Sequence, residues 1–239
     1  MKLTRLLLPA ALAFCSLFAS SGSSFAQNLQ LHYDFGGLLH PDELGSRPRL
    51  TTTAELFRAD KWGSTFYFID MDYAEGGVRQ AYWELSRELK FWEAPLSIHL
   101  EYDGGLSNSF SYRDAYLLGP TYAYATPDYA FTLSLTPMYK YIRGNSRPHS
   151  FQFTAVWGYT FAKGLLTFSG FVDFWTDADL PGKSPVVFLT EPQLWLNFDA
   201  LRGVSPDFNL SLGTEWELSY NFAGSKFYLL PTLALKWAF

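Results

Sequence analysis

The chain has 239 residues, an apolar fraction of 48%, an aromatic fraction of 19% and a formal net charge of −5. Its mean hydropathy is only −0.03, and no apolar run after residue 26 is long enough for a membrane-spanning helix. These values exclude a helical membrane protein, and the lack of clustered Lys and Arg argues against nucleic-acid binding. They fit a sheet whose side chains face lipid and water in turn, because averaging over both faces cancels the hydropathy.

The amino terminus has the pattern of a secretory signal peptide. Lys2 and Arg5 precede an apolar run of about fourteen residues, and Ser24-Phe25-Ala26 offers small residues at the two positions that a signal peptidase reads. The run is shorter than the roughly twenty residues that cross a bilayer, which argues against a membrane anchor. We expect a signal peptide over residues 1–26 and a mature chain over residues 27–239.

Cys15 is the only cysteine in the sequence. A lipoprotein signal usually has a small residue before the lipidated cysteine, whereas here the bulky Phe14 precedes it, so we do not expect lipidation. Removal of the signal peptide would leave no cysteine, and this excludes a disulfide framework and a cysteine metal site from the mature chain.

From Asn28 onward the sequence reads as about twelve strands of about nine to thirteen residues, separated by turn residues. In the fifth of them, Leu96, Ile98 and Leu100 alternate with Ser97, His99 and Glu101. We therefore predict an all-β fold, a transmembrane antiparallel β-barrel of about twelve strands. The strands are expected near residues 28–36, 47–58, 64–74, 79–91, 96–103, 114–125, 129–142, 150–161, 165–176, 186–198, 207–220 and 226–239.

The last expected strand carries large apolar residues on one face and ends at Phe239, which is typical of the closing strand of an outer-membrane barrel. This ending predicts that the chain resides in the cell outer membrane, in contact with its lipid. It also predicts that the barrel assembly machinery recognises the chain through Phe239.

Connections and prolines give further expectations. If the barrel begins in the periplasm, the outer connections are 37–46, 75–78, 104–113, 143–149, 177–185 and 221–225, of which only 75–78 is short. The inner connections are mostly tight turns, with 199–206 as an exception.

Four prolines lie inside expected strands, where each removes a backbone donor from the ladder. We expect bulges or strand ends at Pro120, Pro137, Pro192 and Pro231. Arg87 interrupts the apolar phase of the fourth strand, which indicates a bulge or a position near the membrane interface.

The water-facing phase is strongly acidic. Its few bases include Lys90, Lys140 and Lys236, and aromatic side chains such as Phe66, Phe68, Tyr82, Phe171, Trp195 and Tyr228 share it. Carboxylates accept hydrogen bonds from sugar hydroxyls and base amines, and aromatic faces stack on planar rings, so this phase suits a polar heterocyclic solute. Alternatively, these residues simply fill a wet interior with salt bridges. The acids are Asp34, Glu55, Asp70, Asp72, Glu84, Glu88, Glu101, Asp103, Asp173, Glu191, Glu215 and Glu217.

The sequence offers little for an enzyme. The four histidines have no close spacing for a metal site, and the glycine pairs lie where strands end, so turns explain them better than a phosphate-binding loop. His149-Ser150 has no acid partner placed by the sequence, and the compact histidine-serine-asparagine-glycine signature of outer-membrane phospholipases is missing. We expect no cofactor, no metal and no enzymatic activity.

The segment Trp62–Asp70 (WGSTFYFID), followed by residues 82–89 (YWELSREL), resembles the Tsx-like nucleoside-specific channel family. In that family a tryptophan-glycine turn leads into an aromatic triplet ending in aspartate, and a tyrosine and a glutamate follow in the next strand. The resemblance implies a monomeric barrel of about twelve strands with a narrow channel for nucleosides. It carries over Phe66, Phe68, Asp70 and Glu84 as channel lining, to which the acidic phase adds Asp72 and Glu101.

The chain departs from that family at Ser64-Thr65, where acidic or amide residues are usual, and at Trp83, which replaces a small residue. We predict an outer-membrane channel for passive diffusion of small polar solutes, with nucleosides as candidates. The alternative from another class is a structural or adhesive barrel plugged by its own side chains, and a lipid-modifying barrel enzyme is a third reading.

Overall fold

The computed structural model describes residues 25–180 and 184–239. Most of the expected signal peptide, with Cys15, lies outside these residues, so its cleavage stays a prediction. Phe25 and Ala26, the last two residues of that segment, begin the first strand. No helix in the described part of the chain has the length and hydropathy of a membrane span.

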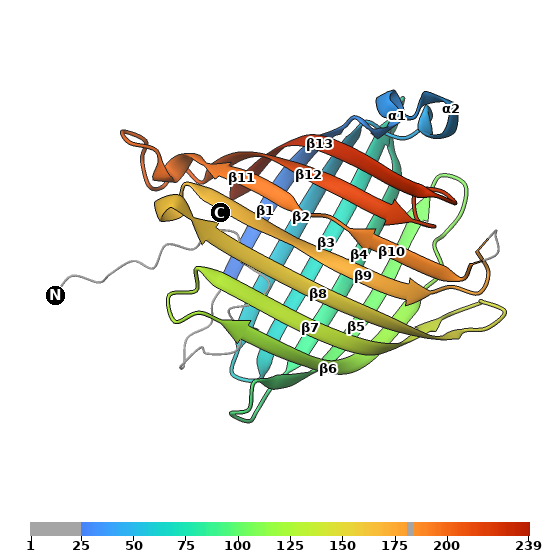
Figure 1. Cartoon of the computed structure of the whole chain (residues 1–239), viewed down its shortest axis with the longest axis horizontal. Coiled ribbons are helices and arrows are strands. Elements are labelled where there is room, and N and C mark those ends of the chain that lie inside the picture. Colours follow the sequence, from blue (N-terminus) through green and yellow to red (C-terminus); the bar gives the residue numbers. More distant parts are fainter. Residues whose placement is uncertain (1–24, 181–183) are drawn as a thin grey trace.

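The described residues form one antiparallel sheet that closes on itself through pairing of the first and last strands (Figure 1). Its elements are β1 (Phe25–Asp34), α1 (Gly36–Leu39), α2 (Pro41–Leu44), β2 (Leu50–Asp60), β3 (Gly63–Ala74), β4 (Gly77–Leu89), β5 (Leu96–Ser107), β6 (Ala115–Ala125), β7 (Phe131–Ile142), β8 (His149–Phe161), β9 (Leu166–Thr176), β10 (Val186–Thr190), β11 (Gln193–Asn197), β12 (Leu210–Tyr220) and β13 (Phe227–Ala238), with short 3₁₀ turns at Ala162–Gly164 and Phe198–Ala200.

β10 and β11 are two parts of one strand. Both pair with β9 on one side and with β12 on the other, and only Glu191 and Pro192 separate them. Counting them together gives a closed antiparallel barrel of 12 strands, which confirms the predicted fold class. The break lies at a proline because Pro192 has no N–H to donate to the ladder.

The expectation of bulges at the prolines was wrong for Pro120, Pro137 and Pro231. The register on either side of each is the same, so the strands run straight through them. Both Pro120 and Pro137 are exposed on the outer face. The register shifts instead between Asp72 and Tyr73, beside the tight turn that joins β3 to β4.

Arg87 causes no bulge either. It lies near the end of β4, where its guanidinium forms two hydrogen bonds of 2.8 Å with the Asp60 carboxylate and one of 3.0 Å with Thr65. A charge paired in this way is tolerated where the strand leaves the apolar band, so the second alternative, a position near the interface, fits the structure.

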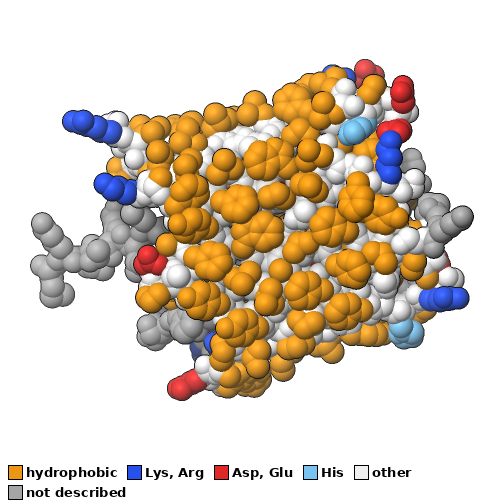
Figure 2. Space-filling model, viewed as in Figure 1, with side chains coloured by type: hydrophobic (Ala, Val, Ile, Leu, Met, Phe, Trp, Pro, Cys, Tyr) orange, Lys and Arg blue, Asp and Glu red, His pale blue; other side chains and the backbone are white. Residues whose placement is uncertain are grey.

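The outer face of the barrel is apolar. Leu29, Leu31, Leu233, Leu235 and Trp237 are all more than 40% exposed there, as the alternation predicts. Figure 2 shows hydrophobic side chains over the whole visible wall, with the charged side chains at its two ends. Such a band has a low free energy only in contact with an apolar medium.

The two ends of the barrel differ. β1 begins and β13 ends at the left of Figure 1, while α1 and α2 lie at the right, where β1 leads into β2. These two short helices were not predicted, because residues 37–46 read as a loop. β5 is also longer than predicted: residues 104–107 continue the strand, and the Gly104-Gly105 pair is not a turn.

Candidate functional site

The acidic phase of the sequence faces the barrel interior. Strand pairing places Asp70 beside Thr53 and Tyr82, and Glu84 beside Phe68 and Asp103, all on the inner wall. Of the three lysines expected in this phase, Lys140 and Lys236 face the interior, whereas Lys90 lies just beyond the end of β4. The interior of the described barrel is therefore rich in carboxylates, as the sequence predicts.

The predicted lining residues come together on one side of the interior. Phe66, Phe68, Asp70 and Asp72 follow one another on the inner face of β3, Glu84 lies beside them on β4, and Glu101 lies beyond it on β5. All six are half-buried. Thr53 and Thr51 donate hydrogen bonds of 2.5 Å to Asp70 and Asp72, which fix these two carboxylates in place.

Aromatic rings form a continuous track along this wall. The centroids of Phe66 and Phe68 are 6.0 Å apart, those of Phe68 and Tyr82 are 6.0 Å apart, and those of Tyr82 and Tyr112 are 6.2 Å apart. Phe110 continues the series at 5.3 Å from Tyr112. The track begins at Phe66, in the first half of β3, and ends at Phe110, in the loop between β5 and β6. This loop lies at the end of the barrel that carries α1 and α2.

Tyr112 joins this track because the residue of β5 next to its ring is Gly105, which has no side chain. A Cβ atom on Gly105 would lie 2.6 Å from the Tyr112 ring, and the Tyr112 N–H donates to the Gly105 carbonyl at 2.9 Å. The sequence did not single out Tyr112, since it lies outside any alternating strand. The signal that could have found it is the glycine pair, which leaves space on the inner wall.

A cluster of carboxylates lies beside the track. Each of Glu84, Glu101 and Asp103 brings a carboxylate oxygen to within 4.8 Å of the others. His99, also on β5, bridges Glu88 at 2.6 Å and Glu101 at 3.0 Å through its two ring nitrogens. The sequence placed these acids on one face, but it did not show which of them meet.

The opposite side of the interior is filled by side chains. Trp195 on β11 is fully buried, and the Lys236 ammonium lies 4.0 Å from the centre of its ring. A Cβ atom on Gly213 would lie 2.3 Å from the same indole, so only glycine leaves room for it there. Leu230 is also completely buried on this wall. The aromatic track on β3 and β4 and the packed wall around Trp195 on β11 thus lie on opposite sides of the barrel.

The connection between β1 and β2, which contains α1 and α2, is held against the inner wall at its end of the barrel, here called the mouth. Arg47 donates to Asp34 at 2.9 Å and to Glu217 at 2.6 Å, both on the inner wall. Burial alone would lower the pKa of Arg47, but the nearby carboxylates of Glu217 and Asp34 raise it above its usual range. Lys226 pairs with Glu43 of α2 and ties the β12–β13 connection to the same segment.

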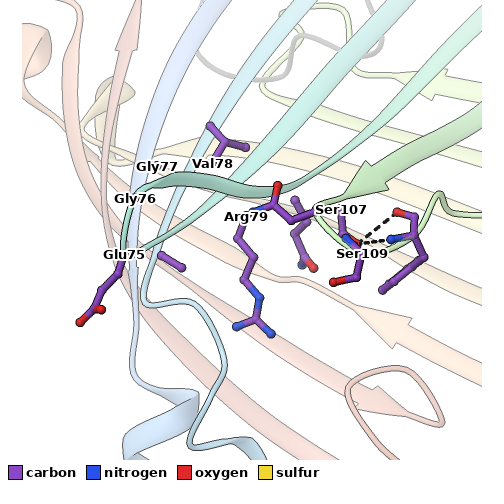
Figure 3. A pocket seen from close by; sticks show the side chains of 11 residues that line it. Glu75, Gly76, Gly77, Val78, Arg79, Ser107 and Ser109 are labelled. Carbon is purple, nitrogen blue, oxygen red and sulfur yellow. Dashed lines mark hydrogen bonds between the residues drawn. The ribbon is translucent and has the colours of Figure 1, made fainter.

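A cleft of about 470 Å³ opens beside this mouth, between the β3–β4 turn and the end of β5. Figure 3 shows Arg79 extending its guanidinium into it, on the side of the ribbon opposite Val78. Arg79 donates to the backbone carbonyl of Ser46 at 2.7 Å, so it also holds the connection between β1 and β2. A second cleft of about 210 Å³ continues from Arg79 to Asp72 and Asp34.

The closed 12-strand barrel is the fold of outer-membrane porins. The KdgM porin has a TM-score of 0.52 at 10% identity, over 90% of this chain and 99% of that one. The NanC porin has a TM-score of 0.56 at 9% identity, over 88% and 98% of the two chains. A further structure is the KdgM porin in complex with disordered oligogalacturonate, with a TM-score of 0.52 at 11% identity, over 90% and 99%.

The chain belongs to the family described as a domain of unknown function, DUF5020, whose model matches residues 26–239. No curated protein matches the chain in sequence. The structural neighbours named above are porins.

Proposed function

We propose that this protein is a channel of the cell outer membrane through which small polar solutes diffuse passively, and that solutes with a planar ring, such as nucleosides, are its preferred class. The aromatic track from Phe66 to Phe110 is the observation that carries the proposal. Its rings follow one another along the inner side of the barrel wall, and half-buried carboxylates lie beside them.

The chemistry of the track suits a nucleoside. Aromatic faces stack on heterocyclic bases with little regard to sequence or base type, and each stacked base contributes about 1–3 kcal/mol. Carboxylates accept hydrogen bonds from sugar hydroxyls and exocyclic amines, and Asp70 and Asp72 face the same space as the rings. The resemblance of residues 62–70 to Tsx-like channels supports the same class of solute.

The acidic wall favours neutral or cationic solutes over anions. A neighbouring structure holds the KdgM porin with oligogalacturonate, whose sugars each carry a carboxylate. In this chain the carboxylates of Asp70 and Asp72 on the inner wall would repel such a ligand. We therefore propose that the shared fold is used here for a different class of solute, by a monomer that needs no cofactor.

Planar-bilayer recording of the refolded protein tests this proposal. We expect discrete conductance steps and a concentration-dependent block of the current by nucleosides. Asp70→Ala and Glu84→Ala should weaken the block, whereas Glu93→Ala, in the exposed turn between β4 and β5, should leave it unchanged. A conducting barrel with no nucleoside block, or a block that Asp70→Ala and Glu84→Ala leave intact, would refute the proposed specificity.

The second candidate is a structural or adhesive barrel without transport. It is favoured by the packed wall, where Trp195 and Leu230 are completely buried inside the barrel. If the refolded, membrane-inserted protein gives no conductance steps, this alternative replaces the channel.

A further inference from the structure

The carboxylates of Glu84, Glu101 and Asp103 converge on one point of the inner wall. We propose that they form a binding site for a calcium ion inside the barrel. The site does not depend on which solute crosses the barrel, and it would exist equally in a plugged barrel.

The spacing of the oxygens fits one coordination sphere. Calcium is bound by oxygen ligands at about 2.3–2.6 Å, so two ligands of the same ion lie at most about 5 Å apart. One oxygen from each of the three carboxylates lies within 4.8 Å of the other two. Neighbouring strands supply them, since Glu84 on β4 pairs directly with Asp103 on β5, and Glu101 is the next inward residue along β5.

Each carboxylate is oriented by one donor, which takes one of its two oxygens. The Tyr82 hydroxyl donates to Glu84 Oε1 at 2.8 Å, His99 Nε2 lies 3.0 Å from Glu101 Oε2, and Lys140 Nζ lies 3.3 Å from Asp103 Oδ2. The other oxygen of each group takes no part in these contacts. This arrangement resembles metal sites, in which outer hydrogen bonds hold the ligands in position.

Asp103 gives an independent indication of a ligand. Its side chain is only 6% exposed, and among the described residues its Oδ1 atom has no hydrogen-bond partner. A buried carboxylate oxygen without a partner costs free energy unless a cation or a donor satisfies it. A calcium ion at the convergence point satisfies Oδ1 and separates the three negative charges at the same time.

The surrounding charges leave the site negative. Glu88 and Asp173 add two more carboxylates nearby, Asp173 close enough to interact electrostatically with Glu84. Lys140 and His99 are the basic residues that contact these acids, and both are already engaged with individual oxygens. A divalent cation therefore reduces the repulsion that the protein's own bases leave in place.

The ligand chemistry selects a hard cation of moderate size. All three ligand atoms are carboxylate oxygens, and both nitrogens of the neighbouring His99 are occupied by Glu88 and Glu101. Zinc and copper favour nitrogen and sulfur ligands. Magnesium usually retains most of its waters and takes one or two carboxylates, whereas calcium accepts three carboxylates and completes a larger, less regular sphere with water.

Calcium titration of the refolded full-length barrel, by isothermal calorimetry after treatment with a chelator, tests the proposal. We expect saturable binding of one ion per barrel. Glu84→Gln and Asp103→Asn should each weaken it by about tenfold or more, because the number of charged ligands sets calcium affinity. Glu191→Gln is the matched control: it removes an inward carboxylate that interacts with Glu215 and Glu217 and lies outside the cluster, so calcium affinity should not change.

Folding of each variant is checked by far-ultraviolet circular dichroism and by heat-dependent mobility in gels. If the folded wild-type barrel binds no calcium, or if Glu84→Gln and Asp103→Asn bind it as tightly as Glu191→Gln, the site does not exist. Calcium binding without nucleoside block would support the site and reject the proposed solute class, so the two proposals fail separately.

Discussion

The ammonium of Lys236 on β13 lies 4.0 Å from the ring centre of Trp195 on β11. β12 runs between these two strands, and Gly213 on β12 leaves the space that the indole occupies. A cation over an aromatic face is stabilised by the ring quadrupole, more strongly where water is excluded. This contact lies on the packed side of the interior.

Trp195→Ala should widen the interior. The substitution removes a fully buried side chain from the inner wall, so we expect a larger single-channel conductance together with a loss of stability of about 3 kcal/mol. Trp237→Ala is the control, because Trp237 is 58% exposed on the outer face and its removal should not change the conductance. An unchanged conductance in Trp195→Ala would show that the conducting path avoids this wall.

Phe68→Ala should interrupt the aromatic track. Phe68 is the ring between Phe66 and Tyr82, and its loss should weaken nucleoside block by about five- to 150-fold, the equivalent of about 1–3 kcal/mol. Phe174→Ala, on the outer face of β9, serves as the control. Block is measured as the concentration that halves the ionic current, and equal values in both variants would contradict the role of the track.

Arg47→Gln should make the connection between β1 and β2 more mobile. It leaves Asp34 and Glu217 without their shared cation, at a cost of about 2 kcal/mol. Because the pKa of Arg47 is raised, the guanidinium keeps its charge at every pH below its usual pKa, and on the alkaline side this stabilisation is lost only on deprotonation in strong alkali. Limited proteolysis around residues 36–46 should become faster, while Arg49→Gln, which alters an exposed arginine two residues away, should be cleaved like the wild type.

The proposed channel should prefer cations. Inward carboxylates lining a narrow space raise the local concentration of cations and repel anions, so a potassium chloride gradient should give a reversal potential of cation-selective sign. Glu191→Gln combined with Glu215→Gln should reduce the selectivity, and Asp128→Asn, in the exposed turn between β6 and β7, should not. Anion selectivity in the wild type would contradict the acidic interior as the determinant.

The two-residue alternation was enough to predict the strands, because a barrel wall separates lipid from water at every residue. It placed Asp70, Glu84 and Glu101 on the inner face. It could not predict that Gly104 and Gly105 lie within β5, since a glycine pair usually marks a turn. Here the Tyr102 and Trp83 side chains lie beside Gly104, and the Tyr112 ring lies beside Gly105.

The sequence also could not predict which side chains meet between strands. The convergence of Glu84 with Asp103, and the reach of Lys140 from β7 to Asp103 across β6, depend on strand register. Alternation tells which face a residue occupies but not its height relative to residues on other strands. The role of each predicted lining residue in solute passage remains a prediction.

The pairing of β1 with β13 joins residues about two hundred positions apart, as in the contact between His32 and Thr232. Bringing such distant segments together costs more chain entropy than forming any hairpin in the wall. Until that seam forms, both strands present unpaired N–H and C=O groups to the bilayer, where they are costly. Closure is thus expected to be the late, rate-limiting event of biogenesis, and substitutions at the seam should slow maturation more than they weaken the finished barrel.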